Sequence, residues 1–393
     1  MAEHVTIAAL MQRGILTMGD GYRTKRSEHG QPGHRIIRVA DVRDGNVFLD
    51  GDDFVSDEYT PQMGAKVAIP GDVLLTTKGT VGRVAVMPAT DEPAVYSPQL
   101  CYFRIIDRNV LDPGYLRYWF GSKEFLAQAS FLQGNTDMAP YISLSDLRAA
   151  TITLPSLPEQ TSIAAVLGVL DDKIAANTRL AATADDLARA LLALAEPNVP
   201  VSEIAVHSRL TVSPEGMAAL RVAHFSLPAF DVGTGPEVVA PESIKSNKFL
   251  VSEPAVLVSK LNPRFPRVWN IPHLPVEPAL ASTEFVVLVP TACSTTVLWA
   301  LTSQPRFGAA LEGMVAGTSG SHQRVKPAEM LATLVPDPRR FEPSLLAQVD
   351  ALGARSLAAR TENVTLVATR DTLLPQLMSG KLMVREAAEM AGL

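Results

Sequence analysis

Cysteine is scarce in this sequence. Only Cys101 and Cys293 occur in 393 residues, and both lie in apolar segments with the pattern of strands. We therefore expect buried free thiols rather than a disulfide or a metal site. The chain also lacks an apolar run near the roughly 20 residues that a membrane-spanning helix needs. Its first residues lack the basic start and the small-residue cleavage site of an export signal, so we expect a globular protein in the cytoplasm.

Positive charge is not in excess either. Lysine and arginine number 35 against 41 aspartates and glutamates, which gives a formal net charge of -6. This balance argues against a protein that wraps nucleic acid through its overall charge. Any contact with DNA has to come from local basic clusters, with help from partner subunits.

Motifs for nucleotide chemistry are missing as well. There is no Walker loop of the form Gly-x-x-x-x-Gly-Lys-Ser/Thr. Segments 262–265 (Asn-Pro-Arg-Phe) and 112–115 (Asp-Pro-Gly-Tyr) are similar to the Asn/Asp-Pro-Pro-aromatic motif of amino-methyltransferases, but both lack the second proline. Neither follows a glycine-rich turn that would hold S-adenosylmethionine. We predict no catalytic residue, and an amino-methyltransferase is the alternative among enzymes.

What the sequence does contain is an internal repeat, in a chain long enough for two domains. Strand-like residues 71–84 and 96–105 in the first half correspond to 255–268 and 281–289 in the second. Both pairs are rich in β-branched residues and bounded by glycine or proline. Each pair is followed by a helical stretch, a polar glycine loop and one further strand. In the first half these lie at 113–133, 134–137 and 150–154, and in the second half at 295–316, 317–324 and 332–335.

A long helical segment closes each half, at about 158–195 and 344–382. Both carry apolar residues at heptad spacing, which is typical of a helix that packs against another helix along its length. Each seam contains one asparagine, Asn177 or Asn363, at corresponding positions. Such a pair suits a buried polar contact that fixes the register of a coiled coil. The alternative is two unrelated amphipathic helices, each packed on its own domain.

The repeat predicts an α/β (α+β) protein with two globular domains separated by two long helices. Residues 197–200 (Pro-Asn-Val-Pro) break the first long helix and mark the start of the second domain. The expected order is a first domain at 1–156, a central helix at 157–196, a second domain at 197–342, and a C-terminal helix and tail at 343–393.

Several segments resemble the DNA-specificity (S) subunits of type I restriction-modification systems. The most distinctive is residues 154–160 (Leu-Pro-Ser-Leu-Pro-Glu-Gln), which lead into the first long helix. In the second half, residues 336–342 depart from this pattern, although Pro343 begins a helix close to the expected place. The other matching segments are 71–83, 97–100 (Ser-Pro-Gln-Leu), 134–144 and 373–382.

The resemblance implies a non-catalytic subunit with two target-recognition domains, each of which reads one half of a bipartite site in double-stranded DNA. It further implies that the long helices pair antiparallel as a spacer and dock two methyltransferase (M) subunits, and that restriction and translocase (R) subunits join the complex. S-adenosylmethionine, ATP and Mg are then expected in the partners and no cofactor in this chain. About 37 helical residues span roughly 55 Å, more than the about 34 Å of one turn of B-DNA. The alternative is a coiled-coil scaffold that binds only protein.

Polar loops of the first domain supply the candidate DNA contacts, because base edges need hydrogen-bonding groups and phosphates need cations and amides. The first candidate is a basic cluster beside a tyrosine. The second is a turn in which two glycines let the backbone approach a phosphate closely. The third is a loop of amide, hydroxyl and carboxylate groups. The simpler readings are a solvated surface run, a hairpin turn and a helix-capping loop. The residues are Tyr22, Arg23, Lys25 and Arg26; Lys78, Thr80 and Arg83; and Gln133, Asn135, Thr136 and Asp137.

The equivalent residues of the second domain are the stronger candidates. Because the two sets differ in composition, we expect the two half-sites to differ in sequence. His322 is interpreted as a hydrogen-bonding residue, since no cysteine or second histidine lies at metal-ligand spacing. The residues are Lys260, Asn262, Arg264 and Arg267 in the strand turn, and Thr318, Ser319, Ser321, His322, Gln323 and Arg324 in the glycine loop.

Overall fold

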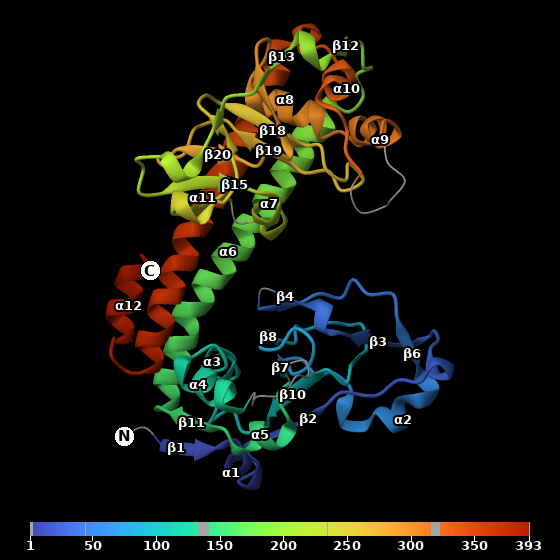
Figure 1. Ribbon diagram of the computed structural model, residues 1–393. Helices are drawn as coiled ribbons and strands as arrows, with labels where there is room; N and C mark the ends of the chain where they lie inside the picture. Colours follow the sequence, from blue (N-terminus) through green and yellow to red (C-terminus); the bar gives the residue numbers. More distant parts are fainter. Residues whose placement is uncertain (1–2, 44, 133–140, 234, 316–322, 393) are drawn as a thin grey trace. The chain divides into compact units, whose positions relative to one another are not determined.

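The computed structural model describes residues 3–43, 45–132, 141–233, 235–315 and 323–392 (Figure 1). The chain divides into two compact units. Unit 1 comprises Met1–Ile174 and Leu366–Leu393, and unit 2 comprises Ala175–Thr365. Both contain helices and strands, so the predicted mixed α/β content is confirmed.

Unit 1 is built on two sheets. An antiparallel sheet has the order β2-β10-β7-β8, and a second sheet has the order β6-β3-β9, in which β3 and β9 are parallel. The strand β7 is buried along its whole length, which explains why its sequence is a continuous apolar run rather than an alternating one. The strands are β2 (Leu16–Asp20), β3 (Gly33–Ile37), β6 (Phe54–Ser56), β7 (Val73–Thr76), β8 (Val84–Val86), β9 (Ala94–Tyr96) and β10 (Leu100–Ile105), with the hairpin β4 (Val42–Arg43) and β5 (Asn46–Val47).

Unit 2 has the same strand order, as the internal repeat predicts. Its antiparallel sheet runs β13-β21-β18-β19, and β16, β15 and β20 take the places of β6, β3 and β9. Two further strands, β17 and β14, extend this second sheet beyond β20. The strands are β13 (Ala205–Ser208), β14 (Thr211–Val212), β15 (Val222–Phe225), β16 (Glu237–Val239), β17 (Lys248–Val251), β18 (Ala255–Ser259), β19 (Val268–Ile271), β20 (Ala279–Ala281) and β21 (Phe285–Pro290).

In each unit a first strand pairs antiparallel with the last one. These pairs are β1 (Glu3–Thr6) with β11 (Thr151–Leu154), and β12 (Val199–Pro200) with β22 (Leu334–Val335). The helices of unit 1 are α1 (Ile7–Gln12), α2 (Thr60–Met63), α3 (Pro113–Trp119), α4 (Lys123–Leu132), α5 (Leu144–Ala149) and α12 (Val384–Ala391). Those of unit 2 are α7 (Leu227–Val232), α8 (Thr295–Thr302), α9 (Pro305–Gly313) and α10 (Pro327–Ala332).

The two long helices are α6 (Leu157–Leu192) and α11 (Pro343–Met378). Both start within one residue of the predicted position and end three or four residues earlier. The chain turns after α11 at Gly380, whose φ of 66° is in the left-handed region that ends many helices. Each unit contains a part of each long helix.

Within unit 2 the long helices are joined by side-chain hydrogen bonds. Asn177 donates to Glu362 at 2.7 Å, and Arg360 donates to Asp185 at 2.7 Å. Residue numbers rise along α6 as they fall along α11, so these segments are antiparallel. We expected the two asparagines to bond each other, but Asn363 donates to Thr178 at 3.0 Å. Asn177 thus has a carboxylate as its acceptor, which makes a stronger hydrogen bond than a neutral amide would.

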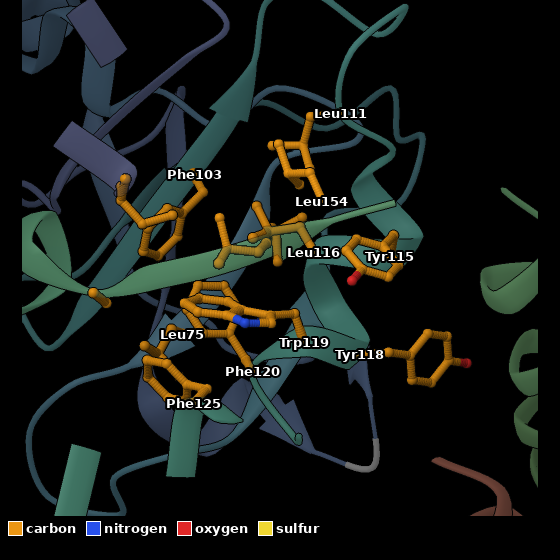
Figure 2. Packing of buried hydrophobic residues seen from close by; sticks show 14 of the residues in the cluster. Leu75, Phe103, Leu111, Tyr115, Leu116, Tyr118, Trp119, Phe120, Phe125 and Leu154 are labelled. Atoms are coloured by element: carbon orange, nitrogen blue, oxygen red, sulfur yellow. The ribbon is translucent and has the colours of Figure 1, made fainter. Parts of the chain in front are cut away.

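Aromatic side chains fill the core of unit 1 (Figure 2). The Trp119 ring lies 5.1 Å from that of Phe120 and 4.9 Å from that of Phe125, and Phe103 of β10 lies 4.8 Å from Phe120. These tilted contacts are the favoured geometry for aromatic pairs. Helix α3, which ends at Trp119, is capped at its start by Asp112, whose carboxylate accepts from the Tyr115 amide at 2.8 Å.

Asp171 of α6 connects this core to the long helices of unit 1. Its carboxylate accepts from Arg117 at 2.6 Å, from the Tyr118 hydroxyl at 2.7 Å and from Arg370 of α11 at 2.9 Å. Figure 2 shows Tyr118 turned away from the other rings of the core. Burial raises the pKa of the Tyr118 hydroxyl, which therefore acts only as a donor to Asp171.

The two cysteines are free thiols. Cys101 is buried in β10, as predicted, and burial raises the pKa of its thiol. Cys293 is only partly buried and lies in the turn before α8 rather than in a strand. Burial still raises the pKa of the Cys293 thiol to about 12, so neither thiol is ionised near neutral pH.

A buried ion pair ties together the strands of unit 1. Asp72, only 1% exposed, accepts from Arg104 at 2.7 and 2.9 Å and from the Tyr96 hydroxyl at 2.8 Å. Replacing Asp72 with alanine would leave the buried Tyr96 hydroxyl and the partly buried Arg104 guanidinium without this acceptor, so we expect the free energy of opening of β7 and β10 to fall by about 3–5 kcal/mol. Amide hydrogen exchange of these strands measures it.

The matched control is Asp50→Ala. The Asp50 carboxylate is 74% exposed and lies 3.3 Å from Arg43, so its removal changes stability by no more than about 1 kcal/mol. Equal protection of β7 and β10 in the two variants would contradict a structural role for the Asp72 ion pair.

Candidate nucleic-acid interface

The turn between β7 and β8 is organised around one buried hydroxyl. The Thr76 hydroxyl donates to the carbonyl of Thr80 at 2.5 Å and accepts from the amide of Arg83 at 2.9 Å. Gly79 and Gly82 have φ angles of 79° and 95°, which side-chain-bearing residues rarely adopt. The turn therefore holds the predicted contacts Lys78, Thr80 and Arg83 at the surface, where all three are exposed.

The predicted basic segment begins directly after β2 and lies against the same region. The Tyr22 amide donates to the carbonyl of Tyr96 at 2.6 Å. The preceding Gly21 allows this approach, because a Cβ there would lie 2.1 Å from the carbonyl oxygen of Ser97. The Tyr22 ring packs beside the small core cluster that contains Ile36.

These segments surround a hollow of about 1040 Å³ in unit 1. It brings together five of the predicted residues, which come from two separate segments of the chain: Tyr22, Arg23, Lys78, Thr80 and Arg83. Four lysines or arginines line the hollow, and none of its fifteen lining residues is acidic. In a chain with a net charge of -6, this is a local concentration of positive charge. The predicted Lys25 and Arg26 are exposed next to Arg23 but do not line the hollow.

The cations of the hollow differ in how they are held. In the described part of the chain, Arg23 and Lys78 form no ion pair, while Arg83 donates to the backbone carbonyl of Val42 at 3.3 Å. The fourth cation, Arg38, is paired with Asp53 at 2.5 Å. Three positive groups of the hollow are therefore available to an anion.

The turn between β18 and β19 in unit 2 repeats this construction. Ser259 takes the place of Thr76: its amide donates to the carbonyl of Arg267 at 2.9 Å, and its hydroxyl accepts from the amide of Leu261 at 3.2 Å. Asn262 stands where unit 1 has Gly79 and has a φ of 48°, the one non-glycine residue with positive φ in the described chain. Asparagine tolerates this conformation better than other side-chain-bearing residues.

The end of the glycine loop returns to this turn in both units. In unit 1 the Ile142 amide donates to the carbonyl of Thr77 at 3.0 Å, and in unit 2 the Val325 amide donates to the carbonyl of Lys260 at 3.0 Å. Lys260 therefore corresponds to Thr77, one residue before Lys78. The Asn262 amide also donates to the carbonyl of Gln323 at 2.8 Å, so this predicted loop residue lies beside the predicted turn.

Two predicted arginines of unit 2 are held by carboxylates. Arg267 binds Asp231 at 2.6 and 2.9 Å, and Arg324 binds Glu284 through two contacts of 3.0 Å. The Arg267 guanidinium lowers the pKa of Asp231, so that carboxylate stays ionised. Arg264 is exposed and forms no ion pair within the described residues. Unit 2 thus presents less free positive charge at its turn than unit 1.

A smaller hollow of about 320 Å³ lies behind the turn of unit 2. Arg264 and Arg267 line it together with the acidic Glu312, whereas Lys260 does not. The remaining predicted contacts lie outside the described residues: Gln133, Asn135, Thr136, Asp137, Thr318, Ser319, Ser321 and His322.

Other residues of the interface were not predicted from the sequence. Gln99, His29 and Arg38 line the hollow of unit 1, and Asp231 and Glu284 hold the arginines of unit 2. Gln99 lies in the Ser-Pro-Gln-Leu segment that carries the family resemblance, which was the signal available for it. The carboxylate partners gave no signal, because they are 36 and 40 residues away from their arginines in the sequence.

Among the residues that the structure describes, no group of three histidine, cysteine, aspartate or glutamate side chains is placed to hold a metal ion. None of the helices in this part of the chain has the length and apolar content to cross a membrane.

Comparison with known proteins gives the site a context. Residues 13–184 match the sequence model of the family described as Type I restriction modification DNA specificity domain. The type I restriction enzyme MjaVIII specificity subunit of Methanocaldococcus jannaschii is 27% identical over 164 residues, 41% of this chain and 38% of that protein. The EcoBI specificity subunit of Escherichia coli is 29% identical over 133 residues, 33% of this chain and 27% of that protein. The chain thus spans well under half the length of these curated relatives.

A solved structure also matches. The crystal structure of the type I restriction-modification system S subunit from M. genitalium has a TM-score of 0.59 with this chain, at 14% identity over 96% of each chain. At that identity the likeness shows a shared fold. Residues 13–184 thus match the type I restriction-modification DNA specificity domain in sequence, and the family resemblance seen in the sequence is confirmed.

Proposed function

We propose that this chain is a specificity subunit in which each unit reads one half of a bipartite target in double-stranded DNA. The observation that carries the proposal is the hollow of unit 1, with four cations and no carboxylate among its lining residues. A surface of this charge attracts the phosphate backbone, which supplies most of the affinity of a DNA-binding protein. The same turn construction in unit 2 supports a second reading surface.

In unit 1, cations and hydrogen-bonding groups have separate tasks. Arg23, Lys78 and Arg83 neutralise phosphates and fix the position of the duplex, whereas Thr80 and Gln99 present a hydroxyl and an amide to base edges. An amide that donates and accepts at once is suited to the N6 and N7 atoms of adenine. Backbone contacts thus give affinity, and the amide and hydroxyl give sequence preference.

In unit 2, the recognition groups are Asn262, Gln323 and Arg324. The Gln323 carbonyl fixes the Asn262 backbone, and Glu284 holds the guanidinium of Arg324 in one orientation while the Arg324 side chain stays 48% exposed. A guanidinium that binds a carboxylate through one side of its plane keeps free N–H donors on the other side, and these can bind a guanine. Because Asn262 and Arg264 replace Gly79 and Val81 of unit 1, the two units read different half-sites.

The long helices are proposed as the spacer between the two readers. Here residues 1–156 and 197–342 are the recognition domains, and residues 157–196 and 343–393 form an antiparallel coiled coil with a C-terminal tail. The antiparallel contacts inside each unit support this, with Asn177 and Asn363 as register residues. A polar side chain in an apolar seam disfavours every helix register in which that side chain has no hydrogen-bonding partner.

The partners follow from the same proposal. The chain carries out no chemistry itself and binds two methyltransferase subunits, which hold S-adenosylmethionine, and restriction subunits, which use ATP and Mg. Proteins related to this chain are named as specificity subunits of type I restriction enzymes, which supports the assignment. This subunit then determines where the partners act.

Replacing Arg324 or Gln323 with alanine tests the division between half-sites. Because both side chains belong to unit 2, we expect either change to relax base preference in one half-site only, by roughly 5- to 150-fold per lost bidentate contact. Equilibrium binding of the full chain to duplexes with single changes in each half of the site measures this preference.

The control is Arg385→Ala, which removes an 89% exposed arginine of α12 outside both turns. It should leave the preference in both half-sites intact. Loss of preference in both halves after Arg324→Ala would contradict independent reading by the two units.

Lengthening the helix pair tests its role as a spacer. One heptad inserted after Ile174 in α6 and one before Leu366 in α11 fall at the boundary between the units, so the hydrogen bonds within each unit are preserved. Seven residues add roughly 10 Å of helix, which corresponds to about three base pairs. Sequencing of duplexes selected from a random pool should therefore show half-sites moved apart by about three base pairs. An unchanged gap would show that the helices do not set the spacing.

A further inference from the structure

Exposed aromatic rings are rare among the residues whose side chains the structure describes. Among the residues whose side-chain burial the structure describes, which leaves out 130–132, only Tyr141 and Phe265 are aromatic residues with largely exposed side chains, at 49% and 61%. A single exposed apolar residue is ordinary and needs no explanation. Here, however, both rings lie on the same structural feature, the turn and returning loop end that form the candidate interface in each unit.

In unit 2 the exposed ring is held by a rigid backbone. Phe265 lies at the tip of the β18–β19 turn, between Pro263 and Pro266, and its amide donates to the carbonyl of Asn262 at 2.8 Å. The two prolines fix their φ angles, so little backbone freedom is left to lose when the ring binds a partner. The exposed Arg264 is its immediate neighbour.

In unit 1 the exposed ring lies in the segment that returns to the turn, not in the turn itself. Tyr141 forms a backbone bridge with Lys78, and the next amide, that of Ile142, donates to Thr77. The corresponding position of unit 2 is Arg324, which bridges with Leu261. Both units thus place an aromatic ring beside a free cation at the turn, but the ring belongs to the turn itself in unit 2 and to the returning segment in unit 1.

We propose that Tyr141 and Phe265 are base-stacking residues, each of which packs its ring on a base at one opened step of the half-site read by its own unit. This rests on the proposed function. The phenylalanine ring has no hydrogen-bonding group and cannot read a base edge by hydrogen bonds, but every base offers a face to it. Apolar wedges of this kind open base steps in many DNA-binding proteins, next to cations that hold the backbone. The neighbouring Lys78 and Arg264 supply those cations.

The salt dependence of binding separates stacking from phosphate contacts. Phe265→Ala and Tyr141→Ala should each weaken binding of the full chain to its selected duplex roughly ten- to hundredfold. The slope of log affinity against log salt should stay unchanged, because no counterion-releasing contact is lost. Arg264→Ala should instead reduce that slope by about 0.9.

Conservative variants separate stacking from simple apolar contact. Phe265→Trp and Tyr141→Phe keep a ring and should bind like the wild type, whereas Phe265→Leu keeps apolar volume without a ring and should bind like Phe265→Ala. A scan with 2-aminopurine should show one fluorescence change in each half-site, lost only in the half-site of the altered unit. Val276→Ala, at a fully exposed position after β19, is the control and should change nothing.

Three results would overturn the proposal while the proposed function stands: alanine variants that bind DNA like the wild type, full rescue by Phe265→Leu, or unchanged DNA binding with lost binding of a methyltransferase subunit. The last would make the rings a protein-docking surface. A wild-type chain without any sequence preference would overturn both the proposed function and the stacking residues.

Discussion

One backbone hydrogen bond, made in the same place in both units, positions the candidate interface. The amide of Ile142 donates to Thr77 in unit 1, and the amide of Val325 donates to Lys260 in unit 2. Each bond fastens the end of a polar glycine loop to the exposed turn of a buried sheet. The sheet supplies rigidity and the turn supplies side chains, so recognition residues can vary without changing the scaffold. This separation is the usual arrangement for binding sites carried on loops.

The electrostatics follow from that placement. A net charge of -6 is unfavourable for a DNA-binding protein, yet the hollow of unit 1 gathers four cations from three segments and no carboxylate. The arginines at the turn of unit 2 are arranged differently, because Asp231 and Glu284 hold two of them in fixed orientations. The first arrangement favours attraction to phosphates, and the second favours directional contacts with bases. Much of the affinity is then expected from unit 1 and much of the discrimination from unit 2.

The repeated architecture was accessible from the sequence because it depends on local patterns. Apolar β-branched runs predicted β7, β10, β18 and β21, and heptad spacing predicted α6 and α11 to within a few residues. The turn that carries Lys78 was also expected, since glycine marks positions of positive φ. Contacts between distant segments were not accessible: neither the pairing of Arg267 with Asp231 nor the hydrogen bond from Asn363 to Thr178 follows from spacing alone. The strands β14 and β17 were not expected either, because the first half has only an isolated bridge between Val67 and Val95 where the second half pairs β17 with β20.

The same turn is proposed to contact DNA in both units. Hydrogen–deuterium exchange of the full chain, with and without a duplex selected by the chain itself, tests this directly. We expect slower exchange on DNA binding in residues 76–83 and 259–267 together, and little change in the sheets behind them, which are protected already. Protection of one turn only, or of segments outside both turns, would contradict it.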